Sequence, residues 1–319
     1  MLSRVADSLY WMSRYLERAE HTARLLDVDL QLRLEGSHDS GAARWVRLLD
    51  ALHAPLPENG KVDPTALAHS LTFDRSNLSS IVSSIAAARE NLRHVREQCS
   101  TVMWEQLNQM YLQLVGNPQP ESWLHHQHHF FGDVRRGVNL FHGVTDSTMS
   151  HGEGWYYIQL GKYMERTDSL AALIGTHFAE LPHPLDQAVE SEEYLEWVGL
   201  LRWCAAFEAY CKSYTAELRP LRVAEFLVLD AEFPHSIRFS IDMLHSALLA
   251  LGDLTKRKAL APTRITGRLR AMLNYSQIEE IMAEGPAAYI EGIRKQIGQV
   301  HHAIYQIYFD YPVEAAMAS

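Results

Sequence analysis

The dipeptide Glu-Arg occurs in two similar stretches, "YLERAEHTARLL" with Glu17 and Arg18 and "YMERTDSLAALI" with Glu165 and Arg166. The second stretch begins 148 positions after the first. A carboxylate can bind an amine or accept a proton, and a guanidinium can hold a carboxylate or a phosphate through two parallel hydrogen bonds. The repeated pair therefore predicts either a polar binding site or a set of structural ion pairs.

A helical pattern surrounds both copies of the dipeptide. Apolar or small residues recur every three or four positions over 9–30 and again over 157–178, which is a heptad-type seam. At 100° per residue, Glu17 and Arg18 fall on either side of the face opposite the first seam. Arg18 lies on a mostly apolar and aromatic stripe, as does Arg166, so both side chains are expected to be partly buried. Each then needs a carboxylate partner, because an unpaired buried charge costs several kcal/mol.

Two hypotheses explain the paired motif. In the first, two equivalent helices cross near a pseudo-twofold axis, and Glu17 pairs with Arg166 while Glu165 pairs with Arg18. In the second, the same groups line a polar pocket between two halves of the molecule and bind a charged ligand. Arg14 stands three residues before Glu17 and adds a cation to either arrangement.

The period of the sequence is helical nearly everywhere, and strand signals are almost absent, so we expect an all-α helical bundle. A second internal similarity, between "FDRSNLSSI" at 73–81 and "FPHSIRFSI" at 233–241, follows the similarity of the two Glu-Arg stretches in the same order along the chain. Two internal similarities in the same order predict two duplicated helical halves, about 1–150 and 151–315, packed as one unit in a domain of 1–315. Further helices are expected at 41–53, 77–98, 100–115, 121–143, 189–213, 219–229, 235–252, 265–283 and 285–309.

Bulk properties exclude several classes of protein. The chain is 47% hydrophobic and 21% charged, which is a globular composition. Its net charge of −10 argues against non-specific binding to nucleic acid or to an anionic membrane. The sequence has no stretch of 18 uncharged apolar residues, so we expect no membrane span. It has only three cysteines, and its N-terminal stretch is charged, unlike a signal peptide; both features favour a cytoplasmic location. Gly-rich phosphate loops and Cys-x-x-Cys are absent, so no cofactor is predicted.

The segment 75–97 is unusually polar for a core helix. Arg89, Glu90 and Arg93 are neighbours at helical spacing, whereas the matching helix of the second half has Leu249 and Ala250 in place of the first two. A solvated helix face with charge pairs is one interpretation. Loss of the charges from the second copy favours the other, a function specific to the first half.

Metal binding is a minor hypothesis. The tract "HHQHH" at 125–129 has histidines at i and i+4, but one adjacent tract without cysteine or carboxylate ligands is weak, and a polar helix or loop explains it as well. Neither Glu-Arg copy has the Glu-x-x-His spacing of di-iron carboxylate proteins, while Asp242 and His245 do have such a spacing elsewhere. No metal ligand is predicted.

Several stretches together resemble the alpha-E domain family: "LYWMSRYLERAEHTARLLDV", "FDRSNLSSI", "MWEQLN", "GVTDSTM" and "FLVLDAEFPHSIRFSI". These are bacterial all-helical proteins named for a Glu-Arg motif, and the resemblance spans nearly the whole chain. Members are typically encoded beside, or fused to, a circularly permuted ATP-grasp protein and a transglutaminase-like cysteine peptidase. ATP-grasp enzymes join a carboxylate to an amine through an acyl-phosphate, so the resemblance implies a part in a peptide- or amide-forming system.

The resemblance carries a set of candidate residues onto this sequence, and Arg14 joins them as the neighbouring cation. Two positions depart from the family pattern: Leu78 stands where proline is common, and His235 stands where arginine is common. The second departure weakens an anion site in the second half. The candidate substrate-binding residues are Arg14, Arg18, Arg75, Ser76, Asn77, Arg89, Asn91, Arg93, Glu165 and Arg166.

We expect a helical partner or substrate-binding subunit of an ATP-grasp amide- or peptide-ligase system. It would bind a peptide, an amino acid or the ligase in a Glu/Arg-lined cleft, with the ATP-grasp protein and the transglutaminase-like peptidase as partners. One alternative is an enzyme with acyl or amide chemistry in the same cleft, in which Glu17 or Glu90 is the catalytic base. The others are a purely structural scaffold and, as a minor one, a carboxylate-bridged metal protein.

Overall fold

The computed structural model describes residues 1–35, 41–57, 62–115, 123–179, 193–214, 218–256 and 260–310. Within these residues every regular element is a helix, and no strand is present, which confirms the predicted all-α fold. A short 3₁₀ helix follows the fourth α-helix, and a π-helical turn follows the last. The α-helices are α1 Ser3–Leu34, α2 Gly41–Ala51, α3 Pro64–Phe73, α4 Ile81–His94, α5 Thr101–Leu114, α6 Trp123–Thr148, α7 Glu153–Ala179, α8 Tyr194–Trp203, α9 Phe207–Tyr214, α10 Pro220–Leu229, α11 Ile237–Thr255, α12 Leu260–Tyr275, α13 Ile278–Glu284 and α14 Pro286–Ile304.

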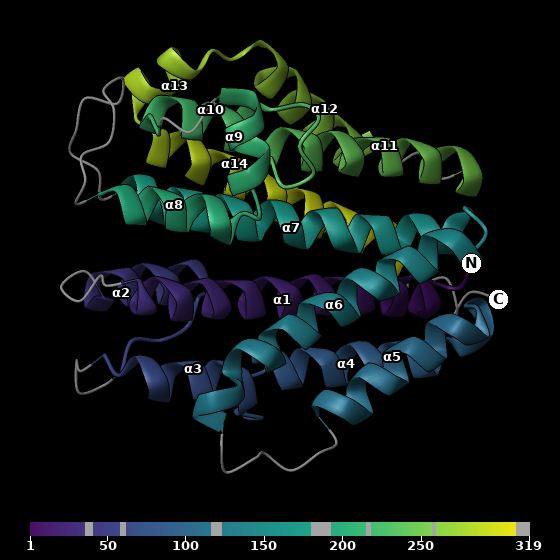
Figure 1. Ribbon diagram of the computed structural model, residues 1–319. Helices are drawn as coiled ribbons and strands as arrows, with labels where there is room; N and C mark the ends of the chain where they lie inside the picture. The colour runs from purple at the N-terminus through teal and green to yellow at the C-terminus, as the bar shows by residue number, and fades with distance from the viewer. Residues whose placement is uncertain are drawn as a thin grey trace.

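The two helices that carry the Glu-Arg pairs lie side by side at the centre of the molecule (Figure 1). They run in the same direction, because the amino group of Met1 meets Glu153 at the start of α7 and Arg18 meets Glu165 further along. Parallel helices that start together bring equivalent positions of the two sequences to the same height. The two motifs therefore face one another.

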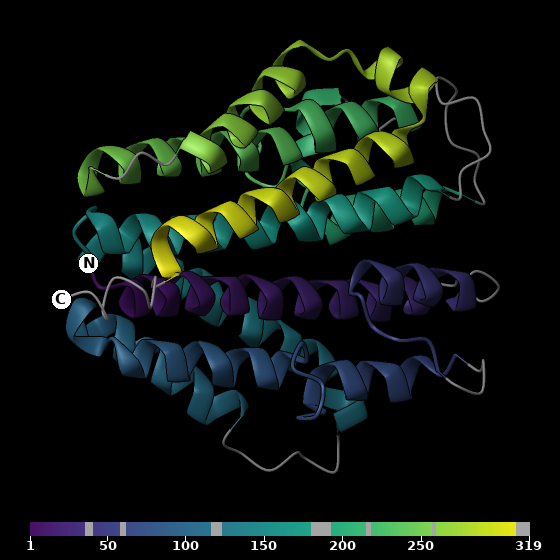
Figure 2. The same ribbon diagram turned by 180° about the vertical axis from the view of Figure 1, so that it is seen from behind.

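Two outer layers cover the central pair. Helices α3 to α6 lie on the α1 side and α10 to α14 on the α7 side (Figure 1). The α6 helix crosses α1 diagonally, while α14 crosses α7 diagonally on the other face of the molecule (Figures 1 and 2). Helix α1 also packs on α4, as α7 packs on α11. One continuous apolar core fills the space between the layers.

The apolar surface of these helices is used for packing. Among the buried side chains are large aromatic ones such as Trp45, Trp197 and Trp203. In the part of the chain that the structure describes, none of the helices has a stretch apolar and long enough to cross a lipid bilayer.

Local backbone signals decide several helix ends and correct the sequence-based bounds. The helix expected over 189–213 is broken between α8 and α9, where Ala205 has a left-handed φ of 53°. The helix expected over 265–283 is broken before α13, where Glu280 accepts a hydrogen bond from the Gln277 N–H at 3.4 Å. Both breaks occur without a proline, so hydrophobic periodicity alone does not reveal them.

Helix α3 is not among the helices that the periodicity predicts, although its start has a clear signal. Asp63 precedes Pro64, and the Asp63 carboxylate accepts hydrogen bonds from the N–H groups of Thr65 and Ala66 at 3.0 and 3.2 Å. An aspartate cap followed by proline at the first helical position is a recognised start of a helix. The helix is only 10 residues long, so its periodic pattern is weak.

Helices α1 and α7 approach one another closely at Gly161. A Cβ atom on this residue would lie 2.2 Å from the Tyr10 carbonyl oxygen and 3.0 Å from the Ser13 Cβ atom. The first neighbour is backbone, which cannot move aside as a flexible side chain can. Glycine is therefore required where the two central helices touch.

We predict that Gly161→Ala lowers the free energy of unfolding by about 1–2 kcal/mol, because overpacking outweighs the better helix propensity of alanine. Gly298→Ala is the matched control, since a Cβ atom at this helical glycine of α14 would meet open space. The control should gain about 0.5–1 kcal/mol. Urea denaturation of both variants measures the difference, and equal effects would contradict the close approach.

Candidate functional site

The two Glu-Arg pairs form reciprocal ion pairs between α1 and α7. Arg166 donates from Nε and Nη2 to Glu17 Oε2 and Oε1 at 3.0 and 2.9 Å. Arg18 donates from Nε to Glu165 Oε1 at 2.6 Å. The first hypothesis from the sequence, in which each glutamate pairs with the arginine of the other copy, is confirmed for these contacts.

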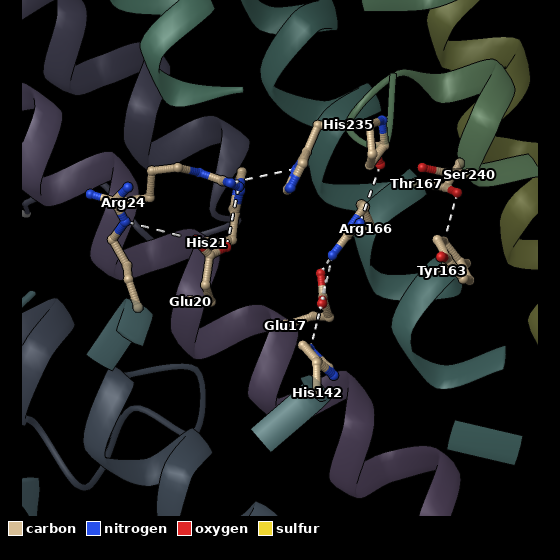
Figure 3. A network of polar contacts seen from close by, with 12 residues as sticks. Glu17, Glu20, His21, Arg24, His142, Tyr163, Arg166, Thr167, His235 and Ser240 are labelled. Atoms are coloured by element: carbon tan, nitrogen blue, oxygen red, sulfur yellow. Dashed lines mark hydrogen bonds and ion pairs between the residues drawn. The ribbon is translucent and has the colours of Figure 1, made fainter. Parts of the chain in front are cut away.

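Each glutamate has a further partner. Arg14 donates from Nε to Glu165 Oε2 at 2.6 Å, so this carboxylate lies between two guanidinium groups. His142 Nε2 lies 2.9 Å from Glu17 Oε1, and Figure 3 shows Glu17 between His142 and Arg166. Arg14 was expected beside Glu17 in its own helix. It contacts the other helix instead, and its guanidinium lies 4.7 Å from the Trp11 ring centroid.

The tyrosine of each Tyr-x-Glu-Arg motif contacts the arginine three residues later. The Arg18 guanidinium lies 5.6 Å from the centroid of the Tyr15 ring, and the Arg166 guanidinium lies 5.6 Å from the Tyr163 ring. Residues three apart are neighbours on a helix, and an aromatic face attracts a cation. The motif thus works as a unit: the ring holds the arginine in place while the arginine reaches the opposite helix.

Both carboxylates remain ionised although they are buried, with 5% of each residue exposed. Burial by itself raises the pKa of Glu17, but Arg166 and His142 outweigh it and hold that pKa well below the usual range. Burial likewise opposes ionisation of Glu165, and Arg14 and Arg18 together lower its pKa. A carboxylate in this state is a strong ion-pair partner and a poor proton acceptor.

A cavity of about 190 Å³ lies beside the Glu165 side of the network. It is enclosed by α1, α7, the end of α2 with the loop after it, α3, and the turn before α4. Charged, polar and apolar groups all contribute to the wall. The lining residues are Arg18, His21, Thr22, Ala51, Leu52, His53, Ala54, Pro55, Leu71, Asn77, Ser79, Glu165, Asp168 and Ser169.

Three residues of the candidate set therefore meet around this cavity: Arg18, Asn77 and Glu165. The helix expected over 77–98 begins later, at Ile81, because Ser80 caps it with a hydrogen bond from the Ser83 N–H. This late start leaves Asn77 in a turn at the cavity wall. Arg14, Glu17 and Arg166 belong to the ion-pair network, and they are not among the lining residues.

Other members of the candidate set lie away from the cavity. Ser76 contacts Asp74 in the same turn, with its hydroxyl 2.6 Å from Asp74 Oδ1, and Arg75 reaches the carbonyl of Val115 at 3.5 Å. Both side chains are exposed.

The charged residues of α4 form a cluster with α5. Arg89 donates from Nε to Asn108 Oδ1 at 2.8 Å and lies over the rings of Tyr111 and Trp104. Glu90 bridges Arg89 and Arg93 at 3.1 and 2.9 Å. Asn91 is also on α4, and its amide donates to the carbonyl of Ala87 at 2.9 Å. None of these residues is among those that line the cavity.

The residues considered for a metal have other partners. His128 Nδ1 lies 2.5 Å from Asp27 Oδ1, which joins the histidine tract to α1; the side chain of His125 is outside the described residues. Asp242 pairs with Arg270, and His245 contacts Thr266. Among the described residues, no group of three or more metal-ligating side chains is gathered in one place.

Sequence reasoning assigned no role in the site to several residues of the cavity wall. Asp168 is one of them, and burial and Glu165 raise its pKa. His53 has a left-handed backbone with φ of 52°, and its ring accepts from Arg294 Nη2 at 2.8 Å. Asp168 is one turn from the second Glu-Arg pair and could have been included from helical spacing. Nothing in the sequence places His53 there.

We predict that Glu17→Gln lowers the free energy of unfolding by about 3–5 kcal/mol, because it leaves the Arg166 guanidinium, whose side chain is only 10% exposed, without its charged partner. Asp133→Asn is the control, since it removes an exposed i,i+3 ion pair to Arg136 that contributes little. Denaturant titration of the two variants compares these costs. Similar small losses in both would contradict a stabilising role for the buried pairs.

Acid should destabilise the protein before its carboxylates titrate. Burial lowers the pKa of His21 and of His177 to about 3, so unfolding allows each to bind a proton once the pH is below about 6.5. The unfolded state then binds more protons, and stability should fall between about pH 6.5 and 3, by up to about 1.4 kcal/mol per pH unit for each histidine. Glu17 and Glu165 add a loss below about pH 4.3, as the pH falls through their lowered pKa values.

Denaturant unfolding at several pH values measures this dependence. His177→Phe should reduce the slope by about one proton between pH 6.5 and 4.5, because it removes one buried histidine. A free energy of unfolding that stays constant over this range, or an unchanged slope in the variant, would contradict the prediction.

No solved structure matches the chain. The chain is 25% identical over 305 residues to uncharacterized proteins of Mycobacterium bovis and Mycobacterium tuberculosis, and the match covers 88% of this chain and 34% of each relative. It therefore spans about a third of the length of these curated relatives. A family model described as "a predicted alpha-helical domain with a conserved ER motif" matches residues 1–309. Since that match covers nearly the whole chain, including both Glu-Arg pairs, the chain belongs to the Alpha-E family.

Proposed function

We propose that this Alpha-E protein is a substrate-binding subunit of an ATP-grasp amide- or peptide-ligase system. The ligand is an amino acid or a peptide, and the partners are a circularly permuted ATP-grasp protein and a transglutaminase-like peptidase. The partners follow from the family resemblance. The observation that supports ligand binding is the cavity of about 190 Å³ beside the Glu-Arg pairs, with charged groups of both signs in its wall.

The volume of the cavity restricts its occupant. Pockets for drug-sized ligands usually measure about 300–1,000 Å³, and this one is smaller at about 190 Å³. A single amino acid or the end of a peptide suits such a space, whereas a nucleotide does not. In the proposal, ATP therefore binds to the ATP-grasp partner, and this chain holds one of the groups to be joined.

The contacts of Glu17 agree better with a protein that binds a ligand than with one in which Glu17 is a catalytic base. Both oxygens of Glu17 accept hydrogen bonds from Arg166, and His142 contacts one of them, so no acceptor is directed at a substrate. Glu90, the other candidate base, is ion-paired on the face of α4. The Glu-Arg pairs then have the structural role of the scaffold hypothesis, and the groups beside them bind the ligand.

The exposed charges of α4 are a contact surface for the ligase in this proposal. About half of the Arg93 and Glu90 side chains is exposed, at 52% and 46%. Leu112 of the neighbouring α5 is also exposed. Exposed apolar and charged side chains together are typical of protein interfaces. The second half has Leu249 and Ala250 in place of Arg89 and Glu90, which agrees with a surface specific to the first half.

We also infer that the domain consists of two duplicated helical halves, about 1–150 and 151–315. The packing of α1 with α4 and α6 resembles that of α7 with α11 and α14, and both Tyr-x-Glu-Arg units have the same ring-to-guanidinium distance of 5.6 Å. The cytoplasm is the proposed location, since Cys99, Cys204 and Cys211 are free thiols.

We predict that the chain co-purifies at micromolar concentration with the ATP-grasp protein encoded in the same genome and increases the amide-forming turnover of that enzyme. Arg93→Glu should weaken the association about tenfold or more, because it reverses a charge on the proposed contact surface. Lys295→Glu, an equal reversal at an exposed position of α14, should leave it unchanged. Absence of any association at micromolar concentration would overturn the proposed function.

A further inference from the structure

We infer that the cavity recognises the carboxylate of an amino acid, either free or at the end of a peptide, through hydrogen-bond donors of His21, Asn77 and Arg18. This inference rests on the proposed function and names the chemical group that the site binds. All three residues line one cavity of about 190 Å³, and each has a donor that no other group in the described part of the chain uses.

His21 provides the most direct observation. The residue is 5% exposed and lines the cavity, and its Nε2 atom is buried without a hydrogen-bond partner. Its Nδ1 atom lies 3.3 Å from Arg24 Nη2, and a guanidinium can only donate, so Nδ1 is the acceptor. The single proton of the neutral ring is therefore on Nε2. A buried donor without an acceptor is costly, and a ligand oxygen that reached Nε2 would remove that cost.

Asn77 adds a second donor. Its Oδ1 atom accepts from the N–H of Ser79 at 2.9 Å, which fixes the orientation of the amide in the turn before α4. The Nδ2 group consequently faces away from this contact and has two hydrogens to donate.

Arg18 adds the charge. Its Nε atom donates to Glu165 at 2.6 Å, and Tyr15 holds the guanidinium from the side, while the two Nη groups have no other partner in the described residues. An arginine fixed at Nε can present its Nη donors to a carboxylate without losing much side-chain freedom. Donors to a charged acceptor form stronger hydrogen bonds than neutral pairs do.

The opposite charge in the wall explains why an amino acid fits better than a plain anion. Asp168 lines the same cavity, and its nearest cation, Arg294, is 3.8 Å away, which is too far for a hydrogen bond. An ammonium group of the ligand would give Asp168 the closer partner that it lacks. Another part of the wall, formed by Ala51, Leu52, Ala54, Pro55 and Leu71, is apolar and suits a small aliphatic part.

The left-handed backbone of His53 indicates that this part of the cavity wall does more than end helix α2. The residue follows the end of α2 with a φ of 52°, in a position that glycine occupies most easily. A side chain is present there at the cost of some backbone strain, and it lies in the cavity wall. Strained positions of this kind are frequent in ligand sites.

The test uses the purified full chain in a thermal-shift screen, followed by calorimetric titration. The probes are each of the twenty common L-amino acids singly, L-alanyl-L-alanine, propionate, ethylamine and inorganic phosphate. We expect at least one amino acid or the dipeptide to bind, more tightly than both propionate and ethylamine. Binding of an amino acid assigns the free form, and binding of the dipeptide alone assigns a peptide end; either result supports the inference.

Two variants connect binding to the proposed donors. Asn77→Asp keeps the acceptor for Ser79 and replaces the amide donor by a carboxylate, so it should weaken binding about tenfold or more. Asn91→Asp is the same change on α4 outside the cavity, and it should have no effect. His21→Phe should weaken binding by a similar factor, whereas His177→Phe, at another buried histidine, should not.

The inference is overturned if no amino acid or dipeptide binds, if ethylamine or phosphate binds as tightly as the best carboxylate probe, or if Asn77→Asp binds like Asn91→Asp. Association with the ATP-grasp protein is measured in parallel on the same preparations. Association without ligand binding would overturn only the carboxylate site, whereas ligand binding without association would overturn the proposed function and leave the site intact.

Discussion

Ion pairs between two buried glutamates and the arginines of two parallel helices determine how the rest of the molecule is arranged. Glu17 and Glu165 lose most of their hydration, and that loss is compensated only when every oxygen has a well-placed donor. The helices must therefore approach closely and in one register. Gly161 permits the approach, and Tyr15 and Tyr163 hold the arginines at the correct side of each helix.

The same network prepares the cavity beside it. Glu165 receives Nε donors from both Arg14 and Arg18, which fixes the Arg18 guanidinium before any ligand arrives. Because the guanidinium is already oriented, a ligand does not have to order a long flexible side chain. The ion pairs and the proposed binding site are thus not alternatives, as they were in the sequence-based hypotheses, because the ion pairs orient Arg18 and Arg18 lines the cavity.

Much of the fold could be predicted from the sequence, because seams such as the one over 9–30 are long and strongly periodic. The reciprocal pairs were also predictable, since internal similarity placed each glutamate opposite the other arginine. The break at Ala205 was not, because a left-handed residue without glycine leaves no pattern. The cavity was only partly predictable: Arg18, Asn77 and Glu165 carry motif signals and Asp168 follows from helical spacing, whereas His53 joins them through tertiary packing alone.

The parallel direction of α1 and α7 imposes a return path on the chain. After α1 the polypeptide has to return to the end where it began before α7 can start, and α6 makes the last part of that return diagonally across α1 (Figure 1). With 26 residues, it spans about 39 Å at 1.5 Å per residue. Adding or removing one turn of this crossover would shift the start of α7 by about 5.4 Å. The length of α6 therefore determines whether the two Glu-Arg pairs, far apart in the sequence, lie at the same height.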